Sequence, residues 1–213
     1  SVHTNFSWSN AFSGATGNYL LRYGTDIGDI MSGEAGTYVE VSGIADDNYF
    51  VEVDLPVGSE IFWNIWAVDA DGSTISANYY GFFTIQSSVP VLNGPIPGNR
   101  TLLQANSPYQ VTGNVEILET RHLIIPAGVE IRVDYKEEEQ EYFEIVVGGE
   151  IRSLGTADDP VIFHSDAIEQ PGMWKGIRLT DKANNLILNA DSTISAGSYF
   201  RHTQISDAGN SGQ

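Results

Sequence analysis

Apolar and polar residues alternate in short runs throughout the first 86 residues of the chain. The clearest runs stand at 19–24, 37–43, 49–55, 60–69 and 79–85, and each is rich in β-branched and aromatic residues. Gly, Asp, Asn or Pro ends each run, and helical periodicity is almost absent. Such alternation is typical of half-buried strands. The pattern predicts an all-β chain that begins with an antiparallel β-sandwich.

The second half of the chain carries a short internal repeat. "GVEIR" at 128–132 returns twenty residues later as "GGEIR" at 148–152. A repeat of this kind predicts stacked coils with an extended surface, and residues one coil apart then lie ~4.8 Å from each other. The offset predicts two inward isoleucine pairs and one pair of bend glycines, namely Ile125 with Ile145, Ile131 with Ile151, and Gly128 with Gly148.

The same offset predicts a ladder of charges on the outer face of the coils. It superposes Glu130 on Glu150 and Arg132 on Arg152. Glu and Arg two positions apart on one face would pair diagonally, which offsets the repulsion between like charges. Surface pairs of this kind contribute only ~0–1 kcal/mol each. We therefore expect them to tune register rather than stability.

The charge balance excludes several partners. The 213 residues include 28 acidic and 10 basic ones, a formal net charge of −18. Nucleic acid and anionic membrane surfaces are poor partners because both require Lys and Arg.

The chain has no cysteine, which excludes disulfides, thiolate catalysis and Cys-ligated zinc. No apolar run approaches the ~20 residues of a membrane helix, so we expect no membrane insertion.

Residues 1–86 contain several words of one module. "FSWS" around Trp8, "NYLLRYGTD", and the turn Leu55-Pro56-Val57-Gly58 ahead of an aromatic strand occur in order. Together they resemble a fibronectin type III module of bacterial extracellular proteins. The resemblance implies that Trp8 is a core residue of the second strand. Because little sequence precedes Trp8, we expect the first strand of the module to be missing.

From about Pro108 the words "PAGVEIRV", "GGEIRSLGTADDPVIF" and "GMWKGI" follow one another. Their order resembles a right-handed parallel β-helix of bacterial secreted and cell-surface proteins, in which Trp174 would be a structural residue. We therefore expect a sandwich at 1–86, a Pro/Gly-rich linker and entry segment at 87–107, and β-helix coils at 108–213. We also expect further coils beyond residue 213.

The resemblance requires that catalysis be considered, because pectate lyases and polysaccharide hydrolases are parallel β-helices. A lyase needs acidic Ca²⁺ ligands beside a base, and a hydrolase needs converging carboxylates. Asp158-Asp159 is the obvious pair, but it lies in the turn "GTADDP", where such residues shape the backbone. His164 and His202 are a possible metal pair in successive coils, although ordinary surface histidines are favoured. We assign no catalytic residue.

Calcium is the one cofactor that the sequence suggests. A dense acidic run at 136–141 separates two apolar strands. Hard cations prefer several carboxylate oxygens, whereas the alternative is a solvated loop. Asp71-Gly72 is a hairpin signal rather than part of a calcium loop. The candidate ligands are Glu137, Glu138, Glu139 and Glu141.

A group of aromatic residues is the candidate ligand site in the first half. Trp63 and Trp66 are three positions apart, so in a strand they face opposite sides. With Tyr79 and Tyr80 they would form a platform for sugar stacking. Packing in the core or at a sheet edge is the alternative, and it is the one we favour.

These observations lead to three hypotheses about function. The first is a non-catalytic spacer, adhesion or ligand-binding scaffold in a large bacterial secreted or surface protein. The second is part of a polysaccharide lyase or hydrolase, and the third is a carbohydrate- or calcium-binding accessory module. We expect polysaccharide or another surface protein as partner, and association through open solenoid ends.

Overall fold

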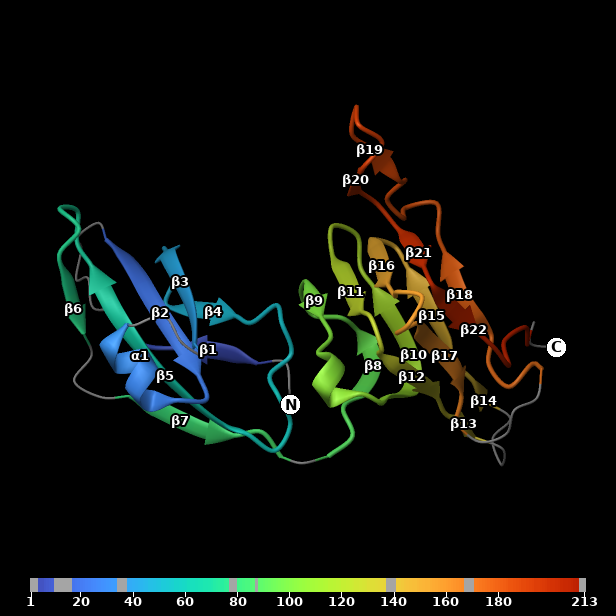
Figure 1. The fold of residues 1–213 in the computed structure, drawn as a ribbon, viewed down its shortest axis with the longest axis horizontal. Helices are drawn as coiled ribbons and strands as arrows, with labels where there is room; N and C mark the ends of the chain where they lie inside the picture. Colours follow the sequence, from blue (N-terminus) through green and yellow to red (C-terminus); the bar gives the residue numbers. More distant parts are fainter. Residues whose placement is uncertain are drawn as a thin grey trace. The chain divides into compact units, whose positions relative to one another are not determined.

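The computed structural model describes residues 4–9, 17–33, 38–76, 80–86, 88–136, 141–166 and 171–210. The chain forms two compact units. The first comprises Ser1–Val51 and Pro56–Ser88, and the second comprises Glu52–Leu55 and Val89–Gln213. Strands dominate both units, which confirms the predicted all-β class (Figure 1).

The first unit consists of antiparallel strands. Its strands are β1 (Asn5–Ser7), β2 (Asn18–Gly24), β3 (Tyr38–Ile44), β4 (Asn48–Phe50), β5 (Glu60–Val68), β6 (Thr74–Ser76) and β7 (Gly81–Thr84). The larger sheet has the order β3-β2-β5-β6 with β7 also on β5, and β1 pairs with β4. Phe6 of β1 packs its ring 5.1 Å from Tyr23 and 5.4 Å from Trp63, between the two sheets. Aromatic packing therefore forms the core of this unit.

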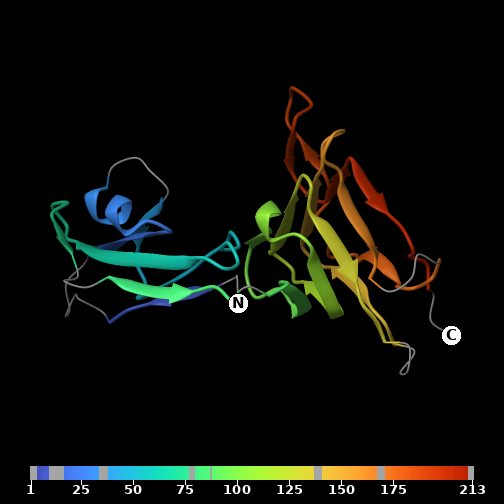
Figure 2. The same ribbon diagram turned by 60° about the horizontal axis from the view of Figure 1, so that its bottom comes forward.

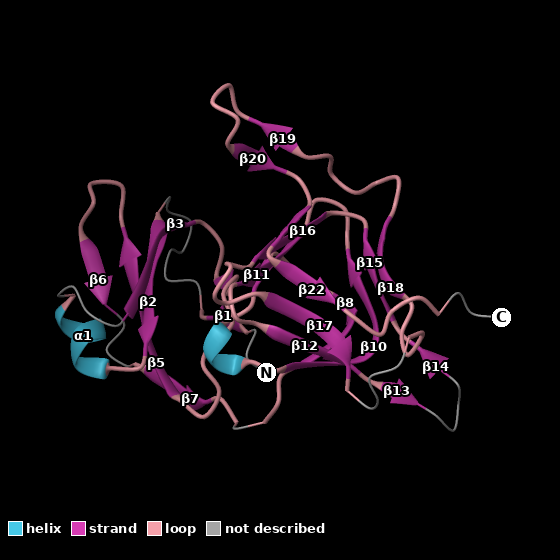
Figure 3. Cartoon of the chain, turned by 45° about the vertical axis from the view of Figure 1, so that its right-hand side comes forward, coloured by secondary structure: helices cyan, strands magenta, loops and turns pink. Residues whose placement is uncertain are grey.

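One short helix, α1 (Ile27–Ser32), lies against the larger sheet of this unit (Figure 3). Asp26 caps its start by accepting hydrogen bonds from the backbone N–H groups of Gly28 and Asp29. Gly33 ends it with φ of 70°, a left-handed conformation that glycine adopts without strain. The Arg22 guanidinium lies 4.8 Å from the Trp66 ring and donates to the Ile30 carbonyl, so one side chain links sheet and helix.

The second unit is a parallel β-helix with three ladders of strands (Figure 1). Ladder 1 joins the first part of β10 (Tyr109–Ile117), β12 (Glu130–Val133), β17 (Val161–Ser165) and β22 (Thr203–Ile205). Ladder 2 joins the second part of β10, β15 (Glu144–Val147) and β18 (Gly176–Leu179). Ladder 3 joins β9 (Arg100–Thr101), β11 (His122–Pro126), β16 (Glu150–Leu154) and β21 (Tyr199–Arg201). The chain visits the ladders in a fixed order.

Three smaller features decorate the coils. A 3₁₀ turn, η1 (Gln104–Asn106), precedes β10. The hairpin of β13 (Tyr135–Lys136) and β14 (Glu141–Tyr142) is inserted after β12 and projects past the strands that it connects (yellow in Figure 2). The hairpin of β19 (Ile187–Leu188) and β20 (Ile194–Ala196) stands out between β18 and β21 (Figure 3).

The predicted twenty-residue stacking is wrong. The true partners are Tyr109, Ile131 and Phe163 in ladder 1, Val115 and Ile145 in ladder 2, and Leu123 and Ile151 in ladder 3. One coil takes 22 residues from Tyr109 to Ile131 and 32 from Ile131 to Phe163. Ile131 and Ile151, which are twenty residues apart, therefore lie in different ladders, the first in ladder 1 and the second in ladder 3. The two similar words are alike because both strands follow a turn and point one isoleucine inward.

The bend glycines occupy different corners for the same reason. Gly128 lies between ladders 3 and 1 and has φ of 73°, whereas Gly148 lies between ladders 2 and 3. A Cβ on Gly148 would lie 3.2 Å from the Ile117 carbonyl oxygen. A Cβ on the next residue, Gly149, would overlap the carbonyl oxygens of Leu118 and Arg121. Gly149 is thus the residue that this corner requires to be glycine.

The predicted linker at 87–107 is also wrong over much of its length. Residues Val91–Pro95 form strand β8, which pairs in parallel with β10, and β9 pairs with β11. Leu92 and Ile96 are buried in the core of the β-helix. Proline is tolerated here because β8 lies at an edge, where a missing N–H leaves no ladder bond unmade. The Pro/Gly content reflects an edge strand rather than a flexible segment.

The interior of the β-helix is one apolar cluster. The residues singled out as structural, Ile125, Ile131, Ile145, Ile151 and Trp174, all lie in it. Alternation along each strand sends every second side chain into this interior. No helix in the described part of the chain is long and apolar enough to span a membrane.

Residues 52–55 form part of the second unit and pair with its first coil. Val53 forms a parallel bridge with Thr101, and the Asp54 N–H donates to the Thr101 carbonyl at 2.9 Å. The Asp54 carboxylate accepts two hydrogen bonds from Arg100, and both residues are buried. Burial, together with the nearby charge of Asp54, raises the pKa of Tyr109 well above its ordinary value.

Candidate ligand-binding face

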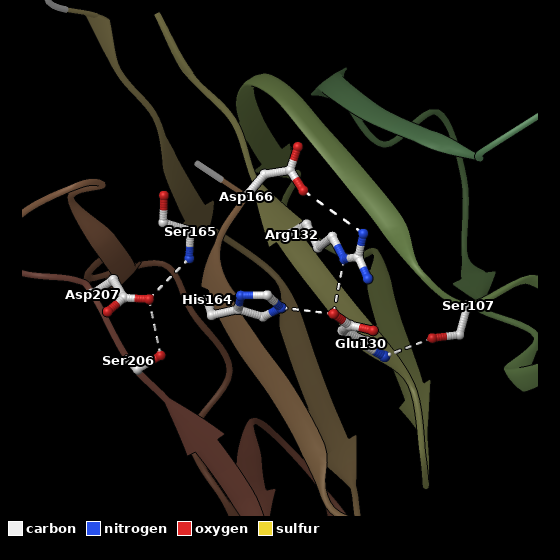
Figure 4. A network of polar contacts seen from close by, with 8 residues as sticks. All are labelled: Ser107, Glu130, Arg132, His164, Ser165, Asp166, Ser206 and Asp207. Atoms are coloured by element: carbon white, nitrogen blue, oxygen red, sulfur yellow. Dashed lines mark hydrogen bonds and ion pairs between the residues drawn. The ribbon is translucent and has the colours of Figure 1, made fainter. Parts of the chain in front are cut away.

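The outer face of ladder 1 collects the polar side chains of two neighbouring strands. In β12 and β17, Ile131, Val133 and Phe163 point inward and are buried. Alternation therefore sends Glu130, Arg132 and His164 outward, and Arg132 is the direct ladder partner of His164. Asp166 follows β17 at once. We call Glu130, Arg132, His164 and Asp166 the ladder-1 cluster (Figure 4).

Glu130 is the centre of this cluster. Its Oε1 accepts a hydrogen bond from Arg132 Nε at 2.8 Å and lies 2.7 Å from His164 Nε2. Arg132 Nη1 reaches Asp166 Oδ1 at 3.8 Å, so the guanidinium bridges two carboxylates. The Glu130 backbone N–H donates to Ser107 Oγ at 2.9 Å, which anchors the start of the strand. All four side chains of the cluster remain partly exposed to solvent.

The electrostatics of the cluster fix its hydrogen-bond roles. The hydrogen bond from Arg132, assisted by the one from His164, lowers the pKa of Glu130. Glu130 is therefore an anion at neutral pH and can only accept hydrogen bonds. His164 must then donate from Nε2, and in the neutral tautomer with this proton Nδ1 is the acceptor. The cluster thus presents guanidinium N–H donors and carboxylate and imidazole acceptors.

Asp207 secures the neighbouring end of the ladder. Its Oδ2 accepts a hydrogen bond from the Ser165 N–H at 3.2 Å and one from Ser206 Oγ at 3.1 Å. Asp207 has φ of 60°, a conformation that aspartate tolerates better than most residues. Figure 4 places this group beside His164, on the side away from Glu130. Ser165 and Asp207 therefore hold the strand end that carries Asp166.

The other two ladders carry outer ion pairs as well. In ladder 2, Arg178 donates two hydrogen bonds of 3.1 Å to Glu144 of the preceding coil. In ladder 3, Glu150 pairs with Arg152 on the same strand and accepts a bond from Asn184. These two bonds lower the pKa of Glu150 although its partial burial acts in the opposite direction.

The predicted superposition of the two Glu-Ile-Arg words is therefore wrong. Glu130 has Ile162 as its ladder neighbour, and Glu150 has His122. Each glutamate pairs with the arginine of its own strand rather than diagonally with the other word. The diagonal geometry occurs instead between Glu144 and Arg178.

The predicted calcium site stays a prediction. Glu137, Glu138 and Glu139 lie outside the described residues, and Glu141 is exposed on β14. No group of three or more His, Cys, Asp or Glu side chains suited to a metal ion occurs in the described part of the chain. Asp71-Gly72 lies in the turn between β5 and β6, as the hairpin signal predicted.

The aromatic candidates within the described residues, Trp63, Trp66 and Tyr80, have different surroundings. Trp63 packs against Phe6 in the first unit, whereas Trp66 is covered by the Arg22 guanidinium. Tyr80 is exposed and contacts Phe62 edge-on at 6.2 Å, and Tyr79 lies outside the described residues. Trp63 and Trp66 thus have separate packing partners.

The two remaining candidates have structural explanations. The Asp159 carbonyl accepts hydrogen bonds from the N–H groups of Gly128 and Thr156, so Asp158-Asp159 shapes a turn as predicted. His164 and His202 are not stacked. The ladder partner of Thr203 is Val161, so the register places His202, one residue earlier, away from His164. His164 contacts Glu130 instead.

Sequence reasoning noticed Glu130, Arg132 and His164 but did not bring them together. It also missed Asp166 and Asp207. The only signal was the coil length, because a step of 32 residues places His164 beside Arg132 whereas a step of twenty does not. The irregular coil lengths conceal that step.

The ladders, the inward apolar columns and the outer charged cluster define a parallel β-helix with a polar face. The family model of the pectate-lyase-like β-helix domain matches residues 94–213. The chain belongs to this family. No curated protein matches the chain, and no solved structure matches it.

Proposed function

We propose that this chain is a saccharide-binding scaffold of a bacterial secreted or cell-surface protein. The ladder-1 cluster is its contact surface, and the first unit, a fibronectin-like spacer module, carries the β-helix. Binding rather than catalysis is the proposed role. Polysaccharide is the proposed ligand class, which the family of the β-helix supports.

The observation that carries the proposal is the pairing of charges in the cluster. Glu130 lies 2.8 Å from Arg132 and 2.7 Å from His164, and Arg132 also reaches Asp166. A paired, pre-oriented set of donors and acceptors suits the hydroxyl groups of sugars, which are neutral and both donate and accept. The ladder partners Arg132 and His164 lie on strands ~4.8 Å apart, so one sugar ring can span both.

Catalysis on the same face is the alternative, and one observation favours it. A carboxylate that orients a histidine and leaves its second nitrogen free is a common arrangement for a general base. Here Glu130 is the carboxylate, it contacts Nε2 of His164, and Nδ1 is the second nitrogen. Incubation of the intact chain with acidic polysaccharides, followed by absorbance of unsaturated products and by reducing-sugar assay, distinguishes the two roles. Turnover that His164→Ala abolishes would overturn the scaffold proposal.

The binding test uses the intact chain and a panel of immobilised neutral and acidic polysaccharides. Arg132→Ala should weaken binding of the best ligand at least about tenfold, because it removes donors and leaves Glu130 and Asp166 without their cation. Arg178→Ala is the matched control, since it deletes an outward arginine from ladder 2. Equal loss in both variants would show a non-specific charge effect. If Arg132→Ala leaves the affinity for saccharide unchanged, the binding site lies outside the ladder-1 cluster.

A further inference from the structure

Two tyrosines lie at the base of the hairpin that is inserted after β12 (Figure 2). Tyr135 of β13 and Tyr142 of β14 are directly opposite each other in antiparallel register. Their ring centroids are 5.1 Å apart, and the ring planes are inclined by 30°. Both side chains are partly exposed. We call these two residues the tyrosine pair, and their rings form one aromatic surface at the base of the hairpin.

The core of the β-helix does not take up this pair. Val133, which precedes the hairpin, and Phe143, which follows it, are 0 and 2% exposed and belong to the apolar cluster. Tyr135 and Tyr142 lie between these two core residues but outside the cluster. As a cross-strand pair they contribute only about 0.2–1 kcal/mol to the hairpin. The pair therefore offers a surface for contact rather than a filling for the core.

The tyrosine pair is close to the ladder-1 cluster. Tyr135 follows Arg132 by three residues, so their Cα atoms are at most ~10 Å apart. The Tyr135 N–H donates to Asp134 Oδ1 at 2.8 Å, which fixes the start of the hairpin. The Asp166 N–H donates to the Val133 carbonyl at 2.9 Å, so Asp166 of the cluster is the ladder neighbour of Asp134. A short oligosaccharide can thus reach from the cluster to the pair.

The chemistry of the two places is complementary for a saccharide. A sugar ring has apolar C–H faces and a rim of hydroxyl groups. Tyrosine presents an apolar ring with one polar tip, which matches such a face. Arg132, Glu130 and His164 present the donors and acceptors that hydroxyl groups require. Ligand sites commonly combine aromatic surface with a few placed polar groups in this way.

The charge of the hairpin restricts the class of saccharide. Residues 134–142 contain five acidic residues and one basic residue, a net charge of −4. Glu141, beside Tyr142, is exposed. A polyanionic saccharide such as a polyuronate would be repelled here, whereas a neutral one would not. The surroundings of the tyrosine pair therefore favour a neutral sugar.

We propose that Tyr135 and Tyr142 form a second subsite, which stacks against a neutral sugar ring of the saccharide chain bound to the ladder-1 cluster. This inference rests on the proposed function and adds to it a second contact and a ligand class. The cluster binds the hydroxyl groups of one sugar, and the tyrosine pair binds the C–H face of another sugar in the same chain. Affinity therefore depends on the length of the saccharide.

Isothermal titration calorimetry of the intact chain tests this dependence. The probes are β-1,4-linked gluco-, manno- and xylo-oligosaccharides from disaccharide to hexasaccharide, and oligogalacturonates of the same lengths with and without Ca²⁺. In the best neutral series the wild type should bind the hexasaccharide at least about fivefold more tightly than the shortest oligosaccharide that binds. Tyr135→Leu/Tyr142→Leu should lose this gain and keep the affinity for the shortest one.

Tyr135→Phe/Tyr142→Phe should retain the gain, because the ring faces remain. Tyr80→Leu is the matched control, since Tyr80 is 50% exposed and lies in the first unit. Near-ultraviolet circular dichroism reports whether each variant keeps its packed core. If the leucine variant does not fold, slowed amide exchange at 141–143 of the wild type with hexasaccharide takes its place as the measurement, and unchanged exchange there would overturn the subsite.

The outcomes separate this inference from the proposed function. If Arg132→Ala weakens binding but the folded leucine variant binds hexasaccharide like the wild type, the subsite is wrong and the proposed function stands. A phenylalanine variant as weak as the leucine variant would overturn stacking. Tighter binding of oligogalacturonates than of every neutral series, with or without Ca²⁺, would overturn the ligand class. If no saccharide binds, both proposals fail.

Discussion

Asp54 and Arg100 form a buried, doubly hydrogen-bonded ion pair inside the second unit. Arg100 Nε donates to Asp54 Oδ1 at 2.9 Å and Nη2 donates to Oδ2 at 3.0 Å. The side chain of Asp54 is 0% exposed and that of Arg100 is 8% exposed. They lie 46 positions apart in the sequence, so the pair attaches residues 52–55 to the first coil of the β-helix.

Asp54→Ala should destabilise the second unit by about 3–5 kcal/mol, because it leaves the Arg100 charge buried and unpaired. Urea unfolding followed by fluorescence measures the change. Asp158→Ala removes an exposed carboxylate from a turn and should cost less than about 0.5 kcal/mol. Asp54→Ala/Arg100→Met should be more stable than Asp54→Ala alone, and a double variant that is no more stable would argue against an unpaired charge as the cause.

The outer glutamates should make stability depend on acid. Hydrogen bonds from Arg132 and then His164 lower the pKa of Glu130 below its ordinary value, and a hydrogen bond from Arg178 lowers the pKa of Glu144 in the same way. A lowered pKa in the folded state contributes stability above the unfolded pKa, and this contribution is lost as pH falls through the folded pKa. Glu130→Gln should therefore lose less stability than the wild type between about pH 6 and about pH 3.

Urea midpoints across that pH range, with unchanged m-values, measure the effect. Glu119→Gln controls for the change in net charge, since Glu119 is exposed and lies 3.8 Å from Lys182. A Glu130→Gln variant whose acid dependence equals that of the wild type would contradict the assigned contacts.

The neighbouring glycines at one corner should respond very differently to a methyl group. Gly149→Ala would place a Cβ against the carbonyl oxygens of Leu118 and Arg121, and backbone atoms cannot move aside cheaply. We expect about 2 kcal/mol of destabilisation or more. The closest atom to the Cβ of Gly148→Ala would be the Ile117 carbonyl oxygen at 3.2 Å, so this variant should cost less than about 1 kcal/mol. Thermal unfolding of both variants measures the difference, and equal effects would refute this corner geometry.

Trp174 should stabilise the core through both its ring and its N–H. Its ring stacks on Phe163 at 6.5 Å, and Nε1 donates to the Ser206 carbonyl at 2.8 Å. Trp174→Phe should cost about 1–3 kcal/mol, because it leaves that carbonyl without its donor and opens a small void. Calorimetry measures the loss. Phe82→Leu changes an exposed aromatic residue and should have little effect.

Local alternation was enough to predict the fold class, because the period of two is set by the strand itself. The repeated words placed Ile131 and Ile151 among structural residues, the β-helix resemblance placed Trp174 there, and all three are in the core. Coil register was not predictable in this way. Register depends on how many residues each corner and insertion uses, and the β13–β14 hairpin lengthens one coil.

The candidate site depends on that register. Sequence reasoning noticed Glu130, Arg132 and His164 singly, but their contact requires a 32-residue step. The helix α1 is not predicted from the sequence because six residues are too few to show helical periodicity. The sequence pattern places residues 52–55 in the first module, because their alternation is that of any strand. Their place in the second unit depends on the bridge between Val53 and Thr101, which are distant in the sequence.

Hydrogen–deuterium exchange of the intact chain, with and without a saturating concentration of its best polysaccharide, tests the central claim most directly. Saccharide bound on the ladder-1 cluster should slow amide exchange at 130–133 and 162–166, and leave 176–179 of ladder 2 unchanged. Arg132→Ala should abolish that protection while the free-state exchange of the core stays the same. Protection confined to other parts of the chain, or saccharide binding that leaves 130–133 and 162–166 unprotected, would contradict the account.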